Sequence, residues 1–203
     1  MPAAISGAVE GILDQAVFER LVASVGADVG NVFPTGGKAR LLAKVQGFNK
    51  AARFGPWLVL VDLDREECAP PFRRRFLRSV APNMAFRVAV RAVEAWLLAD
   101  RQRIAAWLEV PLGLVAARPE ELPDPKLEIV NLGRRSRSRR VRDDMVPRDG
   151  SGRKVGARYP SQLIEFVRDE RHGWRPEVAA RSSDSLDRCL RDLRRIVKIH
   201  GGR

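Results

Sequence analysis

The stretch Trp57-Leu58-Val59-Leu60-Val61-Asp62-Leu63-Asp64 decides the fold of this chain. It is an unbroken run of apolar β-formers that ends in two alternating carboxylates. Such a run is typical of a central strand in a parallel sheet, buried on both faces by helices. In sheets of this kind the chemistry lies at the carboxyl ends of the strands. We therefore expect Asp62 and Asp64 at the functional edge, near enough to share a divalent cation. The plainer alternative is a strand end with solvated acids.

Strand and helix patterns alternate through the first half of the chain. Besides the central strand, apolar strands are predicted over residues 3–9, 29–33 and 84–90. Apolar residues at helical spacing lie between them, and a basic helix is expected over about residues 72–80. The alternation predicts an α/β fold with a right-handed, doubly wound, Rossmann-type parallel sheet of about four strands flanked by helices.

The character of the sequence changes in its second half. Residues 115–158 are rich in Pro, Gly and Arg and show little periodicity, so we expect a basic, loop-rich linker after a catalytic domain over residues 1–114. Helical periodicity returns over residues 159–203, where Ser183 or Asp184 suits the cap of the last helix. This last segment is predicted to be a small helical extension packed on the sheet domain.

The 203-residue chain carries a formal net charge of +12, from 37 Lys and Arg against 25 Asp and Glu. Arginine predominates among the cations, and guanidinium groups suit phosphate oxygens. The charge therefore indicates a nucleic-acid partner; a basic surface kept for solubility is the alternative. Of the two nucleic acids, we expect DNA rather than RNA, although the charge itself does not distinguish them. The densest run is predicted to be a solvated or mobile loop that holds a phosphate backbone. Its candidate contacts are Arg134, Arg135, Arg137, Arg139 and Arg140.

The sequence indicates a cytoplasmic protein. Its two cysteines, Cys68 and Cys189, lack metal-type spacing and suit reduced thiols. The first residues lack the basic start of a secretion signal, and no segment is long and uncharged enough to span a membrane. We therefore expect no membrane partner.

Carboxylates follow three of the predicted strands. Glu10 and Asp14 come after the first strand, Asp62 and Asp64 end the third, and Glu94 follows the fourth. If these strands are neighbours, the acids meet in one crevice, where they repel one another unless a cation neutralises them. All-oxygen ligands favour Mg²⁺, Mn²⁺ or Ca²⁺, and one or two such ions can polarise a phosphodiester. Asp14 and Glu94 also suit a plain role as a helix cap or dipole partner.

Lys38 follows two glycines in the turn Pro34-Thr35-Gly36-Gly37-Lys38. The turn is not a P-loop, because Val32 stands where the first glycine is needed and Ala39 follows the lysine. Lys38 is still a candidate for a phosphate contact, although an exposed loop lysine is the plainer interpretation.

Two of these motifs resemble the Toprim signature. Val9-Glu10-Gly11 closes the first strand with Asp14 one turn on, and Val61-Asp62-Leu63-Asp64 closes the third. The Toprim domain is shared by topoisomerases, bacterial primases and the OLD-type (overcoming lysogenization defect) nucleases. The stretch from Arg87 to Asp100 further resembles the Toprim-like family called domain of unknown function 4276, a relative of the OLD-type nucleases. Pro125-Lys126, Tyr159 and Ser182-Ser183-Asp184-Ser185-Leu186 also look like that family.

The resemblance implies roles for the carboxylates. Glu10 would be a metal ligand or the general acid/base, and Asp62 and Asp64 would be metal ligands. Asp14 and Glu94 would complete a second metal position.

The resemblance also implies a catalytic downstream lysine, for which Lys126 is the candidate and Lys154 the alternative. Ala92 stands where the family often carries another acid, so the second ion would be held less firmly. Asp100 is expected only to be solvated.

These motifs together favour a nuclease that uses Mg²⁺ or Mn²⁺, as one or two ions. The resemblance adds a role in phage defence or a toxin-like system with a separately encoded ATPase. The alternative is a nucleic-acid-binding or regulatory module that keeps the fold without turnover.

A topoisomerase is disfavoured because the only tyrosine, Tyr159, lies outside any recognisable topoisomerase domain. A primase is disfavoured because this length excludes its other domains. A phosphatase that uses Asp62 as nucleophile is disfavoured by Glu66, which stands where Thr or Val is expected.

Overall fold

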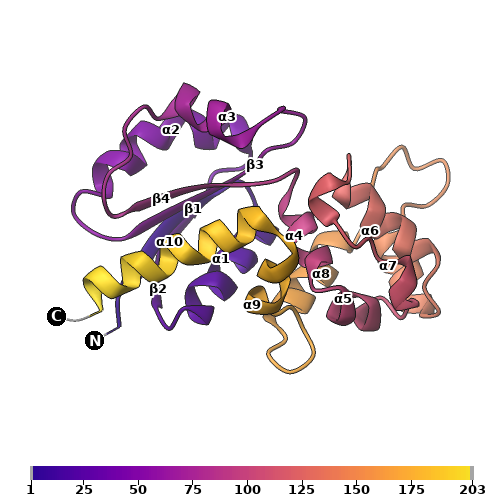
Figure 1. The fold of residues 1–203 in the computed structure, drawn as a ribbon. Coiled ribbons are helices and arrows are strands. Elements are labelled where there is room, and N and C mark those ends of the chain that lie inside the picture. The colour runs from indigo at the N-terminus through magenta and orange to yellow at the C-terminus, as the bar shows by residue number, and fades with distance from the viewer. Residues whose placement is uncertain (1, 202–203) are drawn as a thin grey trace.

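The structure, a computed structural model, describes residues 2–201 and confirms the predicted α/β fold. Four parallel strands form one sheet in the order β2-β1-β3-β4, flanked by helices (Figure 1). The strands are β1 (Ala4–Val9), β2 (Asp28–Pro34), β3 (Trp57–Asp62) and β4 (Met84–Ala89).

The helices of the sheet half are α1 (Ile12–Ser24), α2 (Lys38–Ala51) and α3 (Ala69–Phe76). The helices of the second half are α4 (Val93–Ala99), α5 (Arg101–Trp107), α6 (Pro125–Arg134), α7 (Arg139–Met145), α8 (Tyr159–Arg168), α9 (Pro176–Ala179) and α10 (Asp184–His200). Three short 3₁₀ helices are η1 (Leu112–Leu114), η2 (Pro119–Glu121) and η3 (Ala180–Ser182).

Strand β3 is buried on both faces, as its unbroken apolar run predicts. Leu58 and Leu60 belong to the hydrophobic core on the α1 face, whereas Val59 and Val61 belong to the core under α2 and α3. Successive side chains of a strand point to opposite faces, so a central strand covered twice needs apolar residues at every position. The sheet layer therefore lies between α2 and α3 on one side and α1 and α10 on the other (Figure 1).

Gly7 in β1 sets the distance between the sheet and α1. A Cβ atom at this position would lie 2.1 Å from the Phe18 ring and 2.7 Å from the Leu58 carbonyl oxygen. The absence of a side chain at Gly7 thus lets Phe18 pack directly on the strand backbone, which holds the middle of α1 against β1.

The prediction of a loop-rich linker over residues 115–158 is wrong for much of that segment. It contains α6 and α7, whose buried residues join the same hydrophobic core as β1, α1 and α8. Asp124 caps α6 by accepting a hydrogen bond from the Leu127 N–H at 2.9 Å, and Pro125 occupies its first turn. Burial of Ile129 and Val141 stabilises these two helices, although the polar composition of the segment did not indicate a buried face. The basic helix that was predicted over about residues 72–80 begins and ends earlier in the structure, as α3 from Ala69 to Phe76.

Asp100 is fully buried rather than solvated, which corrects the expectation from sequence. Its carboxylate accepts hydrogen bonds from both ends of the Arg175 guanidinium, at 2.9 and 2.8 Å, and one from the Arg103 N–H. A bidentate arginine is the partner that a buried carboxylate requires, and this pair joins α5 to the segment before α9.

The last helix packs on the sheet, as predicted. Ser183 is its cap and accepts a hydrogen bond from the Leu186 N–H at 3.3 Å. Arg87 of β4 forms an ion pair with Asp192 of α10. Within residues 2–201 the structure contains no helix with the length and hydrophobicity needed to cross a membrane.

Two buried tryptophans join α4 to the C-terminal part of the chain. The Trp96 indole N–H in α4 donates to Ser185 Oγ of α10 at 2.7 Å, and the Trp174 indole N–H donates to the Trp96 carbonyl oxygen at 3.0 Å. Both rings are fully buried, so these hydrogen bonds fix α4 against the C-terminal part of the chain.

Gly7→Ala should destabilise the protein by about 1–3 kcal/mol, because the new methyl group overlaps Phe18 and Leu58. Gly47 in α2 is the matched control, since a Cβ there meets nothing within 4 Å. Gly47→Ala should therefore stabilise the helix by about 0.5–1 kcal/mol. Urea unfolding of both variants measures the difference; equal effects would contradict the close packing of α1 on β1.

Candidate functional site

The site begins where the strand order reverses. The chain runs from β1 to β2 on one side of β1 and then crosses to β3 on the other side, so the ends of β1 and β3 flank a crevice. Glu10 follows β1 and Asp62 ends β3, and the Asp62 backbone N–H donates to Glu10 Oε1 at 2.9 Å. The Glu10 carbonyl oxygen accepts from the N–H groups of Gly36 and Gly37 at 3.0 and 2.9 Å. Both the side chain and the backbone of Glu10 are thus held in place.

Asp14 and Asp62 each accept a hydrogen bond from the backbone at a helix start. Asp14 Oδ2 accepts from the Gly11 N–H at 2.9 Å, and Asp62 Oδ1 accepts from the Val93 N–H at 3.0 Å. The Asp14 contact fits the plain cap role that its position in the sequence suggested. Asp62 in turn fixes the beginning of α4, which carries Glu94.

Glu94 is almost completely buried, with 1% of its surface exposed. Its Oε1 atom accepts a hydrogen bond from the Tyr159 hydroxyl at 3.4 Å and lies 3.5 Å from Lys126 Nζ. Its Oε2 atom is buried without a hydrogen-bond partner. A buried carboxylate oxygen without a partner is costly, so this atom marks a position where a cation or donor is needed.

Asp64 lies at the mouth of the site and pairs with Lys38. Lys38 Nζ is 2.9 Å from Asp64 Oδ2 and donates to the Leu63 carbonyl oxygen at 3.1 Å. Asp64 and Arg91 both have left-handed backbone conformations, with φ of 55° and 61°. The Asp64 N–H donates to the Arg91 carbonyl oxygen at 2.8 Å, and an Arg91 guanidinium N–H donates back to the Asp64 carbonyl oxygen at 3.0 Å. Backbone strain of this kind persists where its surroundings enforce it, and it concentrates at functional sites.

Burial and mutual repulsion raise the pKa values of the inner carboxyl groups. Burial, followed by the charges of Glu10 and Glu94, raises the pKa of Asp14 to about 7. Burial and the charges of Asp14, Glu94, Glu10 and Asp64 raise the pKa of Asp62 well above its usual range. The pKa of Glu10 is also raised, mainly by burial. These shifts identify a group of interacting acids that lacks enough positive charge to neutralise it.

The charge of Glu94 acts on two neighbours. It raises the pKa of Lys126, which therefore stays protonated. Burial, followed by the charge of Glu94, raises the pKa of Tyr159 well above its usual range. The Tyr159 hydroxyl therefore stays protonated and donates a hydrogen bond to Glu94, instead of acting as a nucleophile.

The donor chemistry of the site suits a hard divalent cation. All the candidate ligands are carboxylates, the inner ones repel one another, and Glu94 Oε2 has no partner. Across residues 2–201, however, no three His, Cys, Asp or Glu side chains converge closely enough to form a metal-binding group as they stand. A cation would require the carboxylates to turn toward one another, and Asp64 to leave Lys38.

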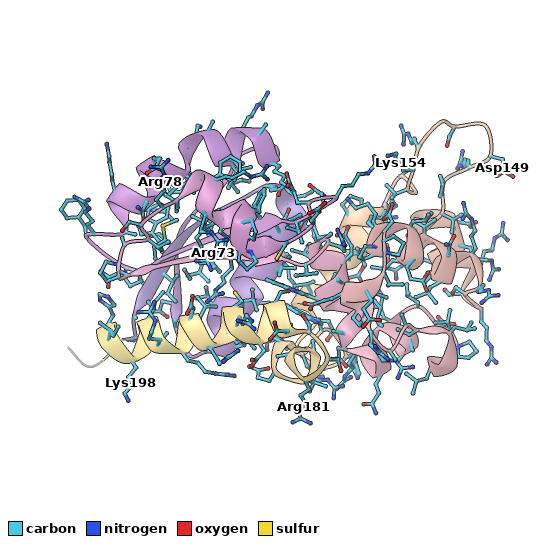
Figure 2. All side chains as sticks on the ribbon, turned by 45° about the horizontal axis from the view of Figure 1, so that its top comes forward. Arg73, Arg78, Asp149, Lys154, Arg181 and Lys198 are labelled. Atoms are coloured by element: carbon cyan, nitrogen blue, oxygen red, sulfur yellow. The ribbon has the colours of Figure 1, made fainter. Side chains whose placement is uncertain are left out.

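A cleft of about 1070 Å³ opens beside the acids. We call it the carboxylate cleft; its lining includes Asp62, Asp64, Lys38, Arg91, Lys126 and Lys154. Figure 2 shows Lys154 on the loop after α7, and its side chain reaches from that loop toward the sheet. The structure therefore brings Lys38 and both candidate downstream lysines to the cleft that Asp62 and Asp64 line.

The arginine run lies elsewhere, outside the lining of this cleft. Arg134 is eight residues beyond Lys126 on α6, which at the helical rise places their backbones about 12 Å apart. Arg139 pairs with Asp143, and Arg140 pairs with Glu165 at 2.8 Å. The candidate contacts Arg134, Arg135, Arg137, Arg139 and Arg140 are thus not among the residues that the structure gathers around the acids.

Sequence reasoning missed several residues of the site. Arg65, Arg75 and Arg91 line the carboxylate cleft, although nothing in the local sequence distinguishes them from other arginines. The contact of Tyr159 with Glu94 joins residues 65 positions apart, which no periodicity reveals.

Comparison of the chain with protein-family models, with curated proteins and with solved structures finds no match.

The folded protein should lose stability as the pH rises from about 4 to about 7. Folded Asp14 keeps its proton up to about pH 7, whereas in the unfolded chain it titrates near its usual 3.8, so deprotonation favours unfolding in this range. The loss should reach a few kcal/mol, measured by urea unfolding in EDTA.

Asp14→Asn should flatten this pH dependence, because the amide oxygen still accepts from Gly11 but carries no charge. Asp149→Asn is the control, since this exposed loop residue has no part in the acidic group (Figure 2). An unchanged pH dependence in the Asp14 variant would contradict the assignment.

Proposed function

We propose that this chain is a divalent-metal-dependent nuclease of the Toprim type that hydrolyses nucleic-acid phosphodiesters. The observation that carries the proposal is the meeting of Glu10 and Asp62 at the point where the strand order reverses, beside a cleft lined by cations. Carboxylates that repel one another need a cation, and a basic protein attracts a polyanion. The Toprim-like motifs around Glu10 and Asp62 support the same conclusion independently.

The carboxylates would hold Mg²⁺ or Mn²⁺, as one or two ions, at Glu10, Asp62 and Asp64, with Asp14 and Glu94 completing a second position. When bound, the metal supplies Lewis-acid polarisation of the phosphodiester and a water of lowered pKa. Alternatively, Glu10, whose pKa is raised mainly by burial, would leave the metal to the aspartates and act as the general acid/base.

The cations of the cleft would bind the substrate. Lys126 remains protonated beside Glu94 and offers its charge to a phosphate oxygen. Lys38 pairs with Asp64 in this structure, and occupation of Asp64 by a metal would free the lysine for a phosphate. The arginines at 134, 135, 137, 139 and 140 remain candidates for contacts with more distant phosphates. A separately encoded ATPase partner and a role in phage defence rest on the family resemblance alone.

Asp62→Asn/Asp64→Asn should lower metal-dependent cleavage by at least about 100-fold, because several kcal/mol of charge stabilisation is lost. Asparagine keeps the hydrogen bond to Val93 and tolerates the positive φ at position 64. Cleavage of plasmid, linear and single-stranded DNA and of RNA is measured with Mg²⁺, Mn²⁺ or EDTA.

Asp28→Asn/Asp149→Asn is the control, because it changes the net charge equally at two exposed positions. It should cleave like the unaltered protein. Binding without cleavage, unaffected by the Asp62 and Asp64 changes, would instead favour the non-catalytic nucleic-acid-binding module.

Mn²⁺ alone should raise the thermal unfolding midpoint of the protein, because a ligand that binds only the folded state stabilises it. Stabilisation of about 2.7 kcal/mol is expected at a concentration 100 times the dissociation constant. The Asp62→Asn/Asp64→Asn variant should show no Mn²⁺-dependent shift in differential scanning fluorimetry. A shift of the same size in that variant would move the metal to other ligands.

A further inference from the structure

A second cleft, of about 480 Å³, lies between α2 and the segment that follows α3. We call it the arginine groove; its lining includes Gln46, Asn49, Arg53, Arg75, Phe76 and Arg78. No carboxylate lines it, in contrast to the carboxylate cleft. The arginine groove therefore has the charge of an anion-binding surface and lacks groups for acid/base or metal chemistry.

Side-chain amides of α2 fix the wall of the arginine groove. Gln46 Nε2 donates to the Phe76 carbonyl oxygen at 2.7 Å, and Asn49 Nδ2 donates to the Ser79 carbonyl oxygen at 3.0 Å. Asn49 Oδ1 also accepts from the Ala81 N–H at 2.8 Å. These bonds hold the loop after α3 against α2, so the groove is preformed and its arginines project from a fixed frame.

Arg75 connects the arginine groove to the carboxylate cleft, because it lines both. It pairs there with Glu66 at 2.6 Å. Lys38 opens α2 and lines the carboxylate cleft, whereas Arg53 follows the end of α2 and lines the groove. The fifteen-residue separation of Lys38 and Arg53 corresponds to about 22 Å along the helix.

Two exposed cations line the arginine groove, and an exposed aromatic residue follows one of them in the chain. Arg53 and Arg78 are exposed, and in the described part of the chain neither forms an ion pair with a carboxylate. Phe54 directly follows Arg53 and is 93% exposed, the highest value among the large apolar residues. Exposed cations in a groove and an exposed aromatic ring next in the chain are features that suit an unpaired strand, because bases in a duplex cannot stack on a side chain.

We propose that the arginine groove is the binding track for a single-stranded nucleic acid that leads into the carboxylate cleft. Arg53 and Arg78 bind phosphates, Phe54 stacks on a base, and Arg75 passes the strand toward Asp62 and Asp64. The inference rests on the proposed nuclease function and specifies its substrate as a single strand.

Binding is measured by fluorescence anisotropy with a 12-nucleotide single-stranded DNA, an RNA of the same sequence and a 12-base-pair duplex. EDTA is present so that binding is separated from cleavage. Arg53→Glu/Arg78→Glu should weaken single-strand binding by on the order of tenfold at 100 mM salt and reduce the salt slope by about 1.4, that is 0.7 for each of two phosphates. Phe54→Ala should weaken single-strand binding several-fold and leave duplex binding unchanged.

Arg181→Glu/Lys198→Glu is the control for net charge. Both residues are exposed, and Figure 2 shows them on the side of the molecule opposite Arg78. This variant should bind single strands within about threefold of the unaltered protein, since a general charge effect is weak at this salt. Thermal unfolding of each variant verifies that it is folded.

Equal losses of single-strand affinity in the groove variant and in the control would refute the binding track. The absence of any binding by the unaltered protein would refute it as well. Equal effects of Phe54→Ala on single strands and duplex would overturn the single-strand assignment. Cleavage that persists while the groove variant binds normally would refute the track and leave the nuclease standing. Binding that depends on the groove, without metal-dependent cleavage, would support the binding track and refute the proposed nuclease function. The DNA and RNA arms decide which strand is preferred.

Discussion

The hydrogen bond from the Asp62 N–H to Glu10 Oε1 is the contact on which the arrangement of the site depends. It crosses between the two central strands at the place where their ends separate, and it fixes a carboxylate that burial would otherwise leave poorly solvated. The side chain of Asp62 then accepts from Val93 and so orients α4. Because α4 carries Glu94, a single series of contacts sets the positions of the acids from β1 to the second half of the chain.

The charges of the site are opposite in sign to those of the molecule as a whole. The chain has a net charge of +12, yet its sheet edge gathers acids whose burial opposes ionisation. Lys38 and Lys126 compensate two of them from opposite sides, one from α2 and one from α6. The surrounding positive potential attracts polyanions, so a negatively charged ligand would find the acids of the cleft flanked by cations.

The sheet could be predicted from sequence because its signal is local. A strand covered on both faces requires an unbroken apolar run, and Trp57 to Asp62 supplies one. The placement of Glu10 and Asp62 at one edge followed from parallel topology. The helices over residues 115–158 were missed because proline, glycine and arginine outweigh the few buried residues, although Asp124-Pro125 is a recognisable helix start. Asp100 and Tyr159 were beyond such reasoning, since their partners Arg175 and Glu94 lie far away in sequence.

The hydrogen bonds of Trp96 with Trp174 and Ser185 have a consequence for the timing of assembly during translation. Strands and helices up to α3 leave the ribosome well before Ser185 is synthesised, and nascent domains fold as their segments emerge. The hydrogen bond that joins α4 to α10 forms only after Ser185 has emerged, so α4, which carries Glu94, lacks this contact in a shorter chain. An unfinished chain therefore contains Glu10, Asp62 and Asp64 without the completed site.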